Sequence, residues 1–121
     1  MKKKVLVVDD NANNLLLEKD LLEVAGFEVF EAENAAGAIA MARREKPDII
    51  ILDVRLPDML GTEAVRILRQ DKETCDIPIV FVTAFVMPEH REGIDAIPNS
   101  GFIGKPINTC TFAKEVSQFI K

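Results

Sequence analysis

The segment IIILDVRLPDMLG, residues 49–61, decides the fold class of this 121-residue chain. Ile49–Leu52 is an apolar run without polar alternation; it ends at Asp53, and a loop with a proline and a glycine follows. A strand has this pattern when both of its faces are buried, as in a parallel sheet with helices on both sides. Val5–Val8 and Ile79–Val82 are runs of the same kind. The three runs therefore predict the central strands of a parallel sheet.

Helix-like stretches alternate with apolar runs along the chain. The expected strands cover residues 5–8, 27–30, 49–52, 79–82 and 102–103, and the expected helices cover 13–25, 34–44, 61–69, a stretch from Pro88 onward, and 108–120. A strand–helix unit repeated five times predicts a single three-layer α/β/α sandwich with a five-stranded parallel sheet. Gly93 and Pro98 disfavour the fourth helix by about 1 and 3 kcal/mol in a helix interior, so we expect it to be short.

Asparagines stand where the helices are expected to begin. Asn11 or Asn13 can cap the first helix, Asn34 the second and Asn108 the last, because an asparagine side chain accepts a hydrogen bond from a free backbone N–H of the first turn. Helical spacing predicts which side chains face inward. In the first and last helices these are Leu15, Leu16, Leu21, Leu22, Ala25, Phe112, Val116, Phe119 and Ile120.

Composition excludes several classes of protein. Lys and Arg number 15 and Asp and Glu number 20, which gives a formal net charge of −5 and argues against direct nucleic-acid binding. No apolar stretch approaches the roughly 18 residues of a membrane span. Cys75 and Cys110 lack disulfide or metal-ligand spacing, which favours a reduced, cytoplasmic setting. We expect one domain over residues 1–121.

Polar residues that could carry chemistry follow the expected strands directly. Asp9 and Asp10 follow the first strand, Asp53 the third, Thr83 the fourth, and Lys105 the fifth after one glycine. The carboxyl ends of parallel strands meet at one edge, so these side chains are expected to converge there. Each aspartate alone is more often a cap or a turn residue, Lys105 alone is compatible with a solvated lysine, and Thr83 alone carries no signal. Together, and in this order, these residues are hard to explain by chance.

Three neighbouring carboxylates repel one another unless one keeps its proton or they share a cation. Oxygen ligands with open positions suit Mg²⁺, which binds one or two carboxylates together with a phosphate oxygen. Lys105 supplies a positive charge and Thr83 a hydroxyl donor for an anion. These groups suit transfer of a phosphoryl group, with Asp53 as the nucleophile.

Four motifs resemble those of the receiver domain of two-component response regulators over nearly the whole chain. They are VLVVDDN (5–11), IIILDVRLPDMLG (49–61), IVFVTA (79–84) and GFIGKP (101–106). The resemblance implies a flavodoxin-like fold with strand order 2-1-3-4-5. It also implies that Asp53 is the phosphorylated residue, that Asp10 binds Mg²⁺ directly and Asp9 through water, and that the backbone carbonyl of Arg55 is a further ligand.

The resemblance assigns the remaining site residues as well. Lys105 matches the lysine that pairs with a phosphoryl oxygen, Thr83 the switch hydroxyl, and Phe102 the switch aromatic residue. Arg55 and Phe85, two residues after Asp53 and Thr83, are expected to flank the approach to the phosphoryl group and to shield it from water. Relatives often have Tyr in place of Phe102; a phenylalanine has no hydroxyl to keep at the surface, which favours an inward rotamer.

The implied function is that of a phosphoacceptor switch. A phosphohistidine on a sensor histidine kinase or a histidine phosphotransfer protein would donate to Asp53, and the face of the fourth helix, fifth strand and fifth helix would change its affinity for an unknown effector. The chain would promote its own phosphorylation and slow dephosphorylation without being a metabolic enzyme. Two alternatives are a Mg²⁺-dependent phosphohydrolase of small esters and a docking module of the same fold without phosphorylation. A stand-alone regulator and a receiver from a hybrid histidine kinase are both compatible with the sequence.

Overall fold

A five-stranded parallel sheet forms the centre of the molecule. The computed structural model describes residues 2–83, 100–104 and 107–120. The strands are β1 (Lys4–Val8), β2 (Glu28–Ala32), β3 (Ile49–Leu52), β4 (Ile79–Thr83) and β5 (Ser100–Gly104). Their order is β2-β1-β3-β4-β5, and every neighbouring pair is parallel. Both the expected fold class and the expected strand order are confirmed.

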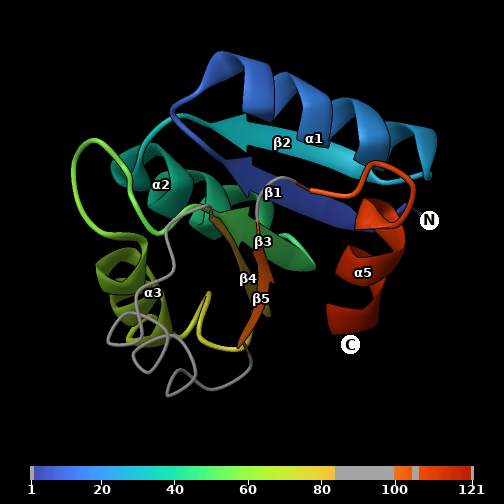
Figure 1. Cartoon of the computed structure of the whole chain (residues 1–121). Coiled ribbons are helices and arrows are strands. Elements are labelled where there is room, and N and C mark those ends of the chain that lie inside the picture. The colour runs from blue at the N-terminus through green and yellow to red at the C-terminus, as the bar shows by residue number, and fades with distance from the viewer. Residues whose placement is uncertain (1, 84–99, 105–106, 121) are drawn as a thin grey trace.

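Helices cover both faces of the sheet. They are α1 (Ala12–Val24), α2 (Ala35–Glu45), α3 (Gly61–Arg69) and α5 (Phe112–Phe119). Figure 1 shows α1 and α5 on one side of the sheet and α2 and α3 on the other. The helix expected from Pro88 onward lies outside the described residues. No helix in the described part of the chain is both long enough and apolar enough to cross a membrane.

The central strands are buried on both faces, as their apolar runs predict. Val5 and Val7 of β1 pack into the core beneath α1 and α5, whereas Leu6 and Val8 pack into the core beneath α2 and α3. All four side chains are at most 1% exposed. Burying one such side chain fully contributes about 1.5–3 kcal/mol, so β1 and β3 supply much of the stability of the sheet.

Two of the three expected asparagine caps are confirmed. The side chain of Asn11 accepts hydrogen bonds from the N–H groups of Asn13 and Asn14 at 3.0 and 3.1 Å, and that of Asn34 accepts one from Gly37 at 2.7 Å. The prediction that Asn108 caps the last helix is wrong. Its side chain accepts from the N–H of Cys110 at 2.9 Å, so it closes a turn, and α5 begins only at Phe112.

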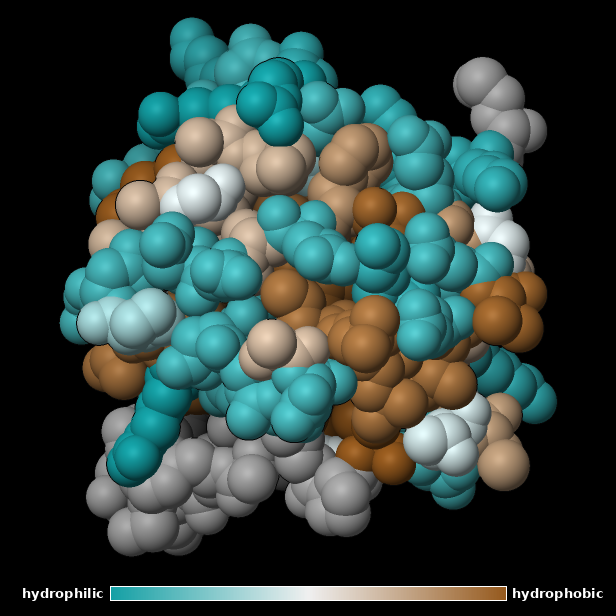
Figure 2. All heavy atoms as spheres, turned by 90° about the horizontal axis from the view of Figure 1, so that it is seen from above, coloured by the Kyte–Doolittle hydropathy of each residue, from teal (hydrophilic) through white to brown (hydrophobic). Residues whose placement is uncertain are grey.

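Two of the residues expected to face inward from the first helix are exposed. Leu15 and Leu22 are buried, but Leu16 is 57% exposed and Ala25 is exposed as well. Leu16 lies about 100° around the helix from Leu15, which takes it off the buried face. Leu17 is also 41% exposed. Seen from above, the side of the molecule that carries α1 shows an apolar area among hydrophilic side chains (Figure 2).

Gly61 allows α3 to begin directly against the end of β3. Its N–H donates to the carbonyl oxygen of Val54 at 2.6 Å. A Cβ atom at this position would overlap the backbone carbonyl oxygen of Asp53 and would lie 3.2 Å from the Cα of Val54. These are backbone atoms, which cannot rotate away as the end of a side chain can.

We therefore expect Gly61→Ala to lower the free energy of unfolding by about 1–3 kcal/mol, the usual cost of overpacking. Gly104→Ala is the control, because the nearest atom to its Cβ would be Cε1 of Phe102 at 3.7 Å, an ordinary contact. It should change the free energy by no more than about 0.5 kcal/mol. Urea unfolding followed by far-UV circular dichroism measures both variants. Equal stability of Gly61→Ala and the wild type would contradict the close approach.

Candidate functional site

The carboxyl ends of β1 and β3 bring Asp9 and Asp53 to neighbouring positions. Val8 of β1 pairs with Leu52 of β3, and each aspartate is the next residue along its strand. The N–H of Asp53 donates to the carbonyl oxygen of Val8 at 3.3 Å, which extends the pairing of the two strands by one residue. The N–H of Asp9 donates to Ala32 of β2 at 3.2 Å. The backbone of both residues is thus fixed by the sheet.

Each of these two carboxylates is also oriented by a backbone N–H two residues further along. Oδ1 of Asp9 accepts from Asn11 at 2.9 Å, and Oδ1 of Asp53 accepts from Arg55 at 3.1 Å. Both bonds span two residues along the chain, the spacing at which an aspartate side chain closes a local turn. Asp9 is 2% exposed, whereas Asp53 is half-buried. Asp53 is therefore within reach of a partner molecule, and Asp9 supports the site from beneath the surface.

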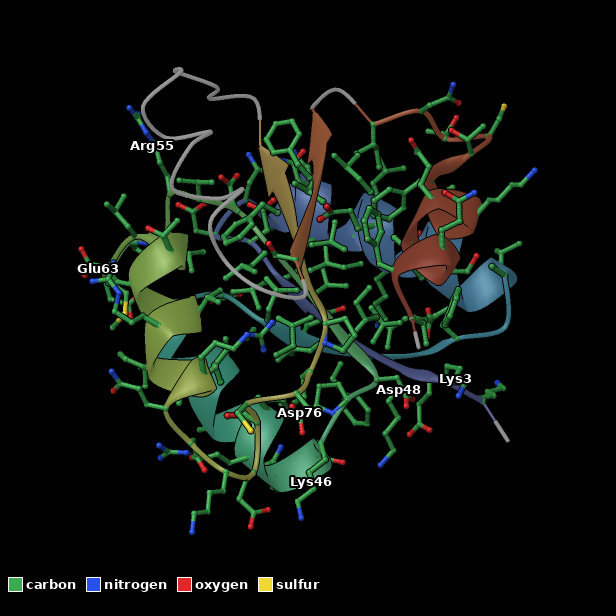
Figure 3. The ribbon with its side chains drawn as sticks, turned by 90° about the horizontal axis from the view of Figure 1, so that it is seen from below. Lys3, Lys46, Asp48, Arg55, Glu63 and Asp76 are labelled. Carbon is green, nitrogen blue, oxygen red and sulfur yellow. The ribbon has the colours of Figure 1, made fainter. Side chains whose placement is uncertain are left out.

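Asp10 and Arg55 complete the part of the site that the structure describes. Asp10 follows Asp9 on the surface and is exposed. The side chain of Arg55 is exposed too, and Figure 3 shows it pointing outward at the edge of the molecule opposite to Lys46, Asp48 and Asp76. Arg55 thus carries a positive charge at the rim of the carboxyl edge.

The donor set suits a hard divalent cation. The expected ligands are carboxylate and carbonyl oxygens, which are the ligands of Mg²⁺ rather than of Zn²⁺ or copper. Within residues 2–83, 100–104 and 107–120, no three His, Cys, Asp or Glu side chains are grouped as a metal cage. Mg²⁺ does not need one, because it keeps several waters and binds one or two carboxylates. A buried Asp9 beside Asp53 places negative charge where a cation would offset it.

The other expected site residues are described only in part. Thr83 ends β4 and pairs with Gly104 of β5, so its backbone stands at the same edge of the sheet, but its side chain lies outside the described part. Lys105 and Phe85 lie outside the described residues. Phe102 is half-buried and packs against the core beneath α2 and α3.

The response regulator receiver domain model matches residues 5–117 of the chain. The chain belongs to this family. It is therefore a receiver domain of two-component signalling, and the expected family is confirmed.

Several relatives resemble the receiver domain over its full length. The polar-differentiation response regulator DivK of Brucella anthropi is 35% identical over 99% of this chain and 98% of the relative. The structure of the chemotaxis response regulator CheY4 of Vibrio cholerae matches with a TM-score of 0.91 at 32% identity. The match covers 99% of this chain and 100% of the CheY4 chain. The receiver domain of sensor histidine kinase PA1611 from Pseudomonas aeruginosa, with a TM-score of 0.88 at 24% identity and 98% of both chains covered, shares the fold.

Asp58 is a residue near the site that sequence reasoning missed. It lies in the loop between β3 and α3, and its two carboxylate oxygens accept hydrogen bonds from the N–H groups of Ala35 and Ala36, both at 2.9 Å. These two N–H groups belong to the first turn of α2, where they have no partner within the helix. The only signal in the sequence is an aspartate after Pro57, which is also typical of an ordinary turn.

These bonds make the charged form of Asp58 the favoured one. The N–H groups of Ala35 and then Ala36 lower the pKa of the Asp58 carboxyl below its ordinary value of 3.8. A carboxyl whose pKa is lower in the folded protein stabilises the fold above its ordinary pKa. That contribution is lost as the pH falls through the lower, folded value.

We expect Asp58→Ala to unfold at a lower urea concentration than the wild type at pH 6. The difference between the two urea midpoints should persist down to about pH 4 and shrink below the ordinary value of 3.8. Urea titrations at a series of pH values measure it. A difference that is as large at pH 2.5 as at pH 6 would show that the lost contribution is not the charged carboxylate.

Proposed function

We propose that this receiver domain is a phosphoacceptor switch in which Asp53 accepts a phosphoryl group from a phosphohistidine. The observation that carries the proposal is the position of Asp53. It stands half-buried at the carboxyl end of a central strand, next to buried Asp9, with its carboxylate oriented by the N–H of Arg55. A nucleophile in such a site is held in one orientation and is still open to a donor on one side.

The same residues suit a bound Mg²⁺. Asp10, Asp53 and the backbone carbonyl of Arg55 would hold it directly, and Asp9 would hold it through water. When bound, the ion neutralises charge on the transferred phosphoryl group. The PA1611 receiver domain, solved with a magnesium ion coordinated in its active-site cleft, supports this assignment by its shared fold.

The residues of the chain then have distinct parts in the transfer. A carboxylate oxygen of Asp53 attacks phosphorus in line, the P–N bond of the phosphohistidine breaks, and the leaving imidazole nitrogen keeps the electron pair and takes a proton from solvent. Lys105 pairs with a phosphoryl oxygen, and the hydroxyl of Thr83 donates to another. These contacts lower the barrier to phosphoryl transfer, because they place a positive charge and a hydrogen-bond donor beside the phosphoryl oxygens that carry negative charge in the transition state.

Phosphorylation would change the affinity of the protein for an effector. The attraction between Thr83 and the new phosphoryl group biases Phe102 inward, and the face of β5, α5 and the helix expected from Pro88 changes with it. The donor is a sensor histidine kinase or a histidine phosphotransfer protein. The setting is the cytoplasm, where such donors act.

Asp53→Asn should abolish phosphorylation by a small acyl-phosphate donor. The wild type should gain the mass of one phosphoryl group in the presence of Mg²⁺ and none with a chelator, because the transfer needs the cation. Asp48→Asn is the matched control: it lies just before the same strand, at the amino end, where its carboxylate accepts from the N–H of Lys4 at 2.7 Å. Intact-mass spectrometry measures all three proteins.

Asp48→Asn should gain the phosphoryl group as the wild type does. A gain by Asp53→Asn equal to that of the wild type would contradict the assignment of the nucleophile. Catalytic turnover of a small phosphate ester by the wild type, without accumulation of the phosphoprotein, would favour a phosphohydrolase instead.

The bulk of Arg55 and Phe85 should prolong the life of the acyl phosphate. Both positions are expected to flank the approach to the phosphoryl group, and large side chains there would exclude the water that hydrolyses it. The double variant Arg55→Asn with Phe85→Ala should lose the phosphoryl group several-fold faster than the wild type. The half-life is measured by intact mass after removal of the donor, and equal half-lives would rule out the shielding.

A further inference from the structure

The loop between β3 and α3 is closed at its base by backbone contacts. Arg55 and Leu60 form an antiparallel bridge, and the N–H of Gly61 donates to Val54 at 2.6 Å. The segment therefore runs out from the end of β3 and returns to it, with Pro57 and Asp58 at its tip. The carbonyl of Arg55, the proposed cation ligand, belongs to one arm of this loop.

Asp58 joins the tip of the loop to a rigid part of the fold. Its carboxylate binds the N–H groups of Ala35 and Ala36 at 2.9 Å each. Ala35 is fully buried in the core beneath α2 and α3, so the first turn of α2 is held in place by packing. A bond from each of the two carboxylate oxygens fixes the direction of the side chain as well as its position.

We propose that Asp58 is a positioning residue for the cation site of this receiver domain. The loop is closed at its base by the Arg55–Leu60 bridge and the Gly61–Val54 bond, and it is held at its tip by α2. A loop held at both ends has its peptide groups fixed between them. The direction of the Arg55 carbonyl is therefore set partly by Asp58, which itself lies on the far side of the loop from β3. This inference rests on the proposed function, because it needs the Arg55 carbonyl to bind Mg²⁺.

A purely structural role for Asp58 is the competing explanation, and Asp71 provides the comparison. Asp71 also joins a loop to α2: its carboxylate binds Nε of Arg43 at 2.5 Å and the N–H of Glu73 at 2.9 Å. Asp71 follows α3 and precedes β4, so it lies toward the amino edge of the sheet, where Figure 3 places Asp76 and Asp48. Loss of Asp71 should affect stability without affecting the cation site.

The test is the Mg²⁺ dissociation constant of the unphosphorylated protein, measured by isothermal titration calorimetry. Asp58→Ala should weaken Mg²⁺ binding by about tenfold, the lower end of what the loss of a residue behind a metal ligand costs. Asp58→Asn keeps one acceptor oxygen and should fall between Asp58→Ala and the wild type. Asp71→Ala should bind Mg²⁺ as the wild type does. In Mg²⁺-free protein, the amides of residues 54–60 should exchange hydrogen faster in Asp58→Ala than in Asp71→Ala.

Several results would overturn the inference. Mg²⁺ binding by Asp58→Ala with the affinity of the wild type would show that the Arg55 carbonyl does not depend on Asp58. An equal loss in Asp71→Ala would show that the effect follows stability rather than position. If the wild type neither binds Mg²⁺ nor takes up a phosphoryl group, the proposed function fails and this inference with it. Loss of Mg²⁺ binding and phosphorylation in the wild type thus contradicts the proposed function, whereas wild-type Mg²⁺ affinity in Asp58→Ala contradicts only the positioning role of Asp58.

Discussion

The parallel pairing of β1 with β3 is the constraint on which the rest of the structure depends. Both strands carry apolar side chains on both faces, so they can be buried only between two helical layers. Their register pairs Val8 with Leu52 and thereby sets Asp9 beside Asp53 at one edge. The burial of hydrocarbon over the length of these strands offsets the cost of bringing one buried and one half-buried carboxylate together.

Local backbone bonds then convert this edge into a site with defined geometry. Asp9 and Asp53 each bind the N–H two residues further along, and Gly61 lets α3 begin against the backbone of Asp53. Asp58 binds the first turn of α2 and thereby holds the loop between β3 and α3. In such a site the carboxylates are oriented before any ligand arrives, which would reduce the reorganisation that the proposed phosphoryl transfer requires.

Much of this arrangement could be predicted from the sequence, because runs of β-branched and apolar residues and the polar residues after them are local signals. The parallel sheet, its helices and the place of Asp53 at a strand end follow from such patterns. The caps at Asn11 and Asn34 follow as well, whereas Asn108 has the same chemistry and closes a turn before α5. One asparagine pattern serves both turn and cap, so the sequence alone does not separate them.

Contacts between distant segments could not be predicted in this way. Asp58 and Ala35 are 23 residues apart, and no periodicity links them. The outward position of Leu16 likewise depends on how α1 is rotated over the sheet, which a run of three leucines leaves open. The sequence therefore predicts the chemical groups of the proposed site. The contact of Asp58 with the first turn of α2, which the sequence does not predict, holds the loop that carries Arg55.

The most direct test of the account is to map the residue that becomes phosphorylated. The protein is incubated with a phosphohistidine donor and Mg²⁺, and the acyl phosphate is then reduced with borohydride, which converts a phosphorylated aspartate to homoserine. Peptide mass spectrometry locates the product. We predict homoserine at position 53 alone. Homoserine at Asp9 or Asp10, or phosphate retained on a residue other than aspartate, would contradict the account.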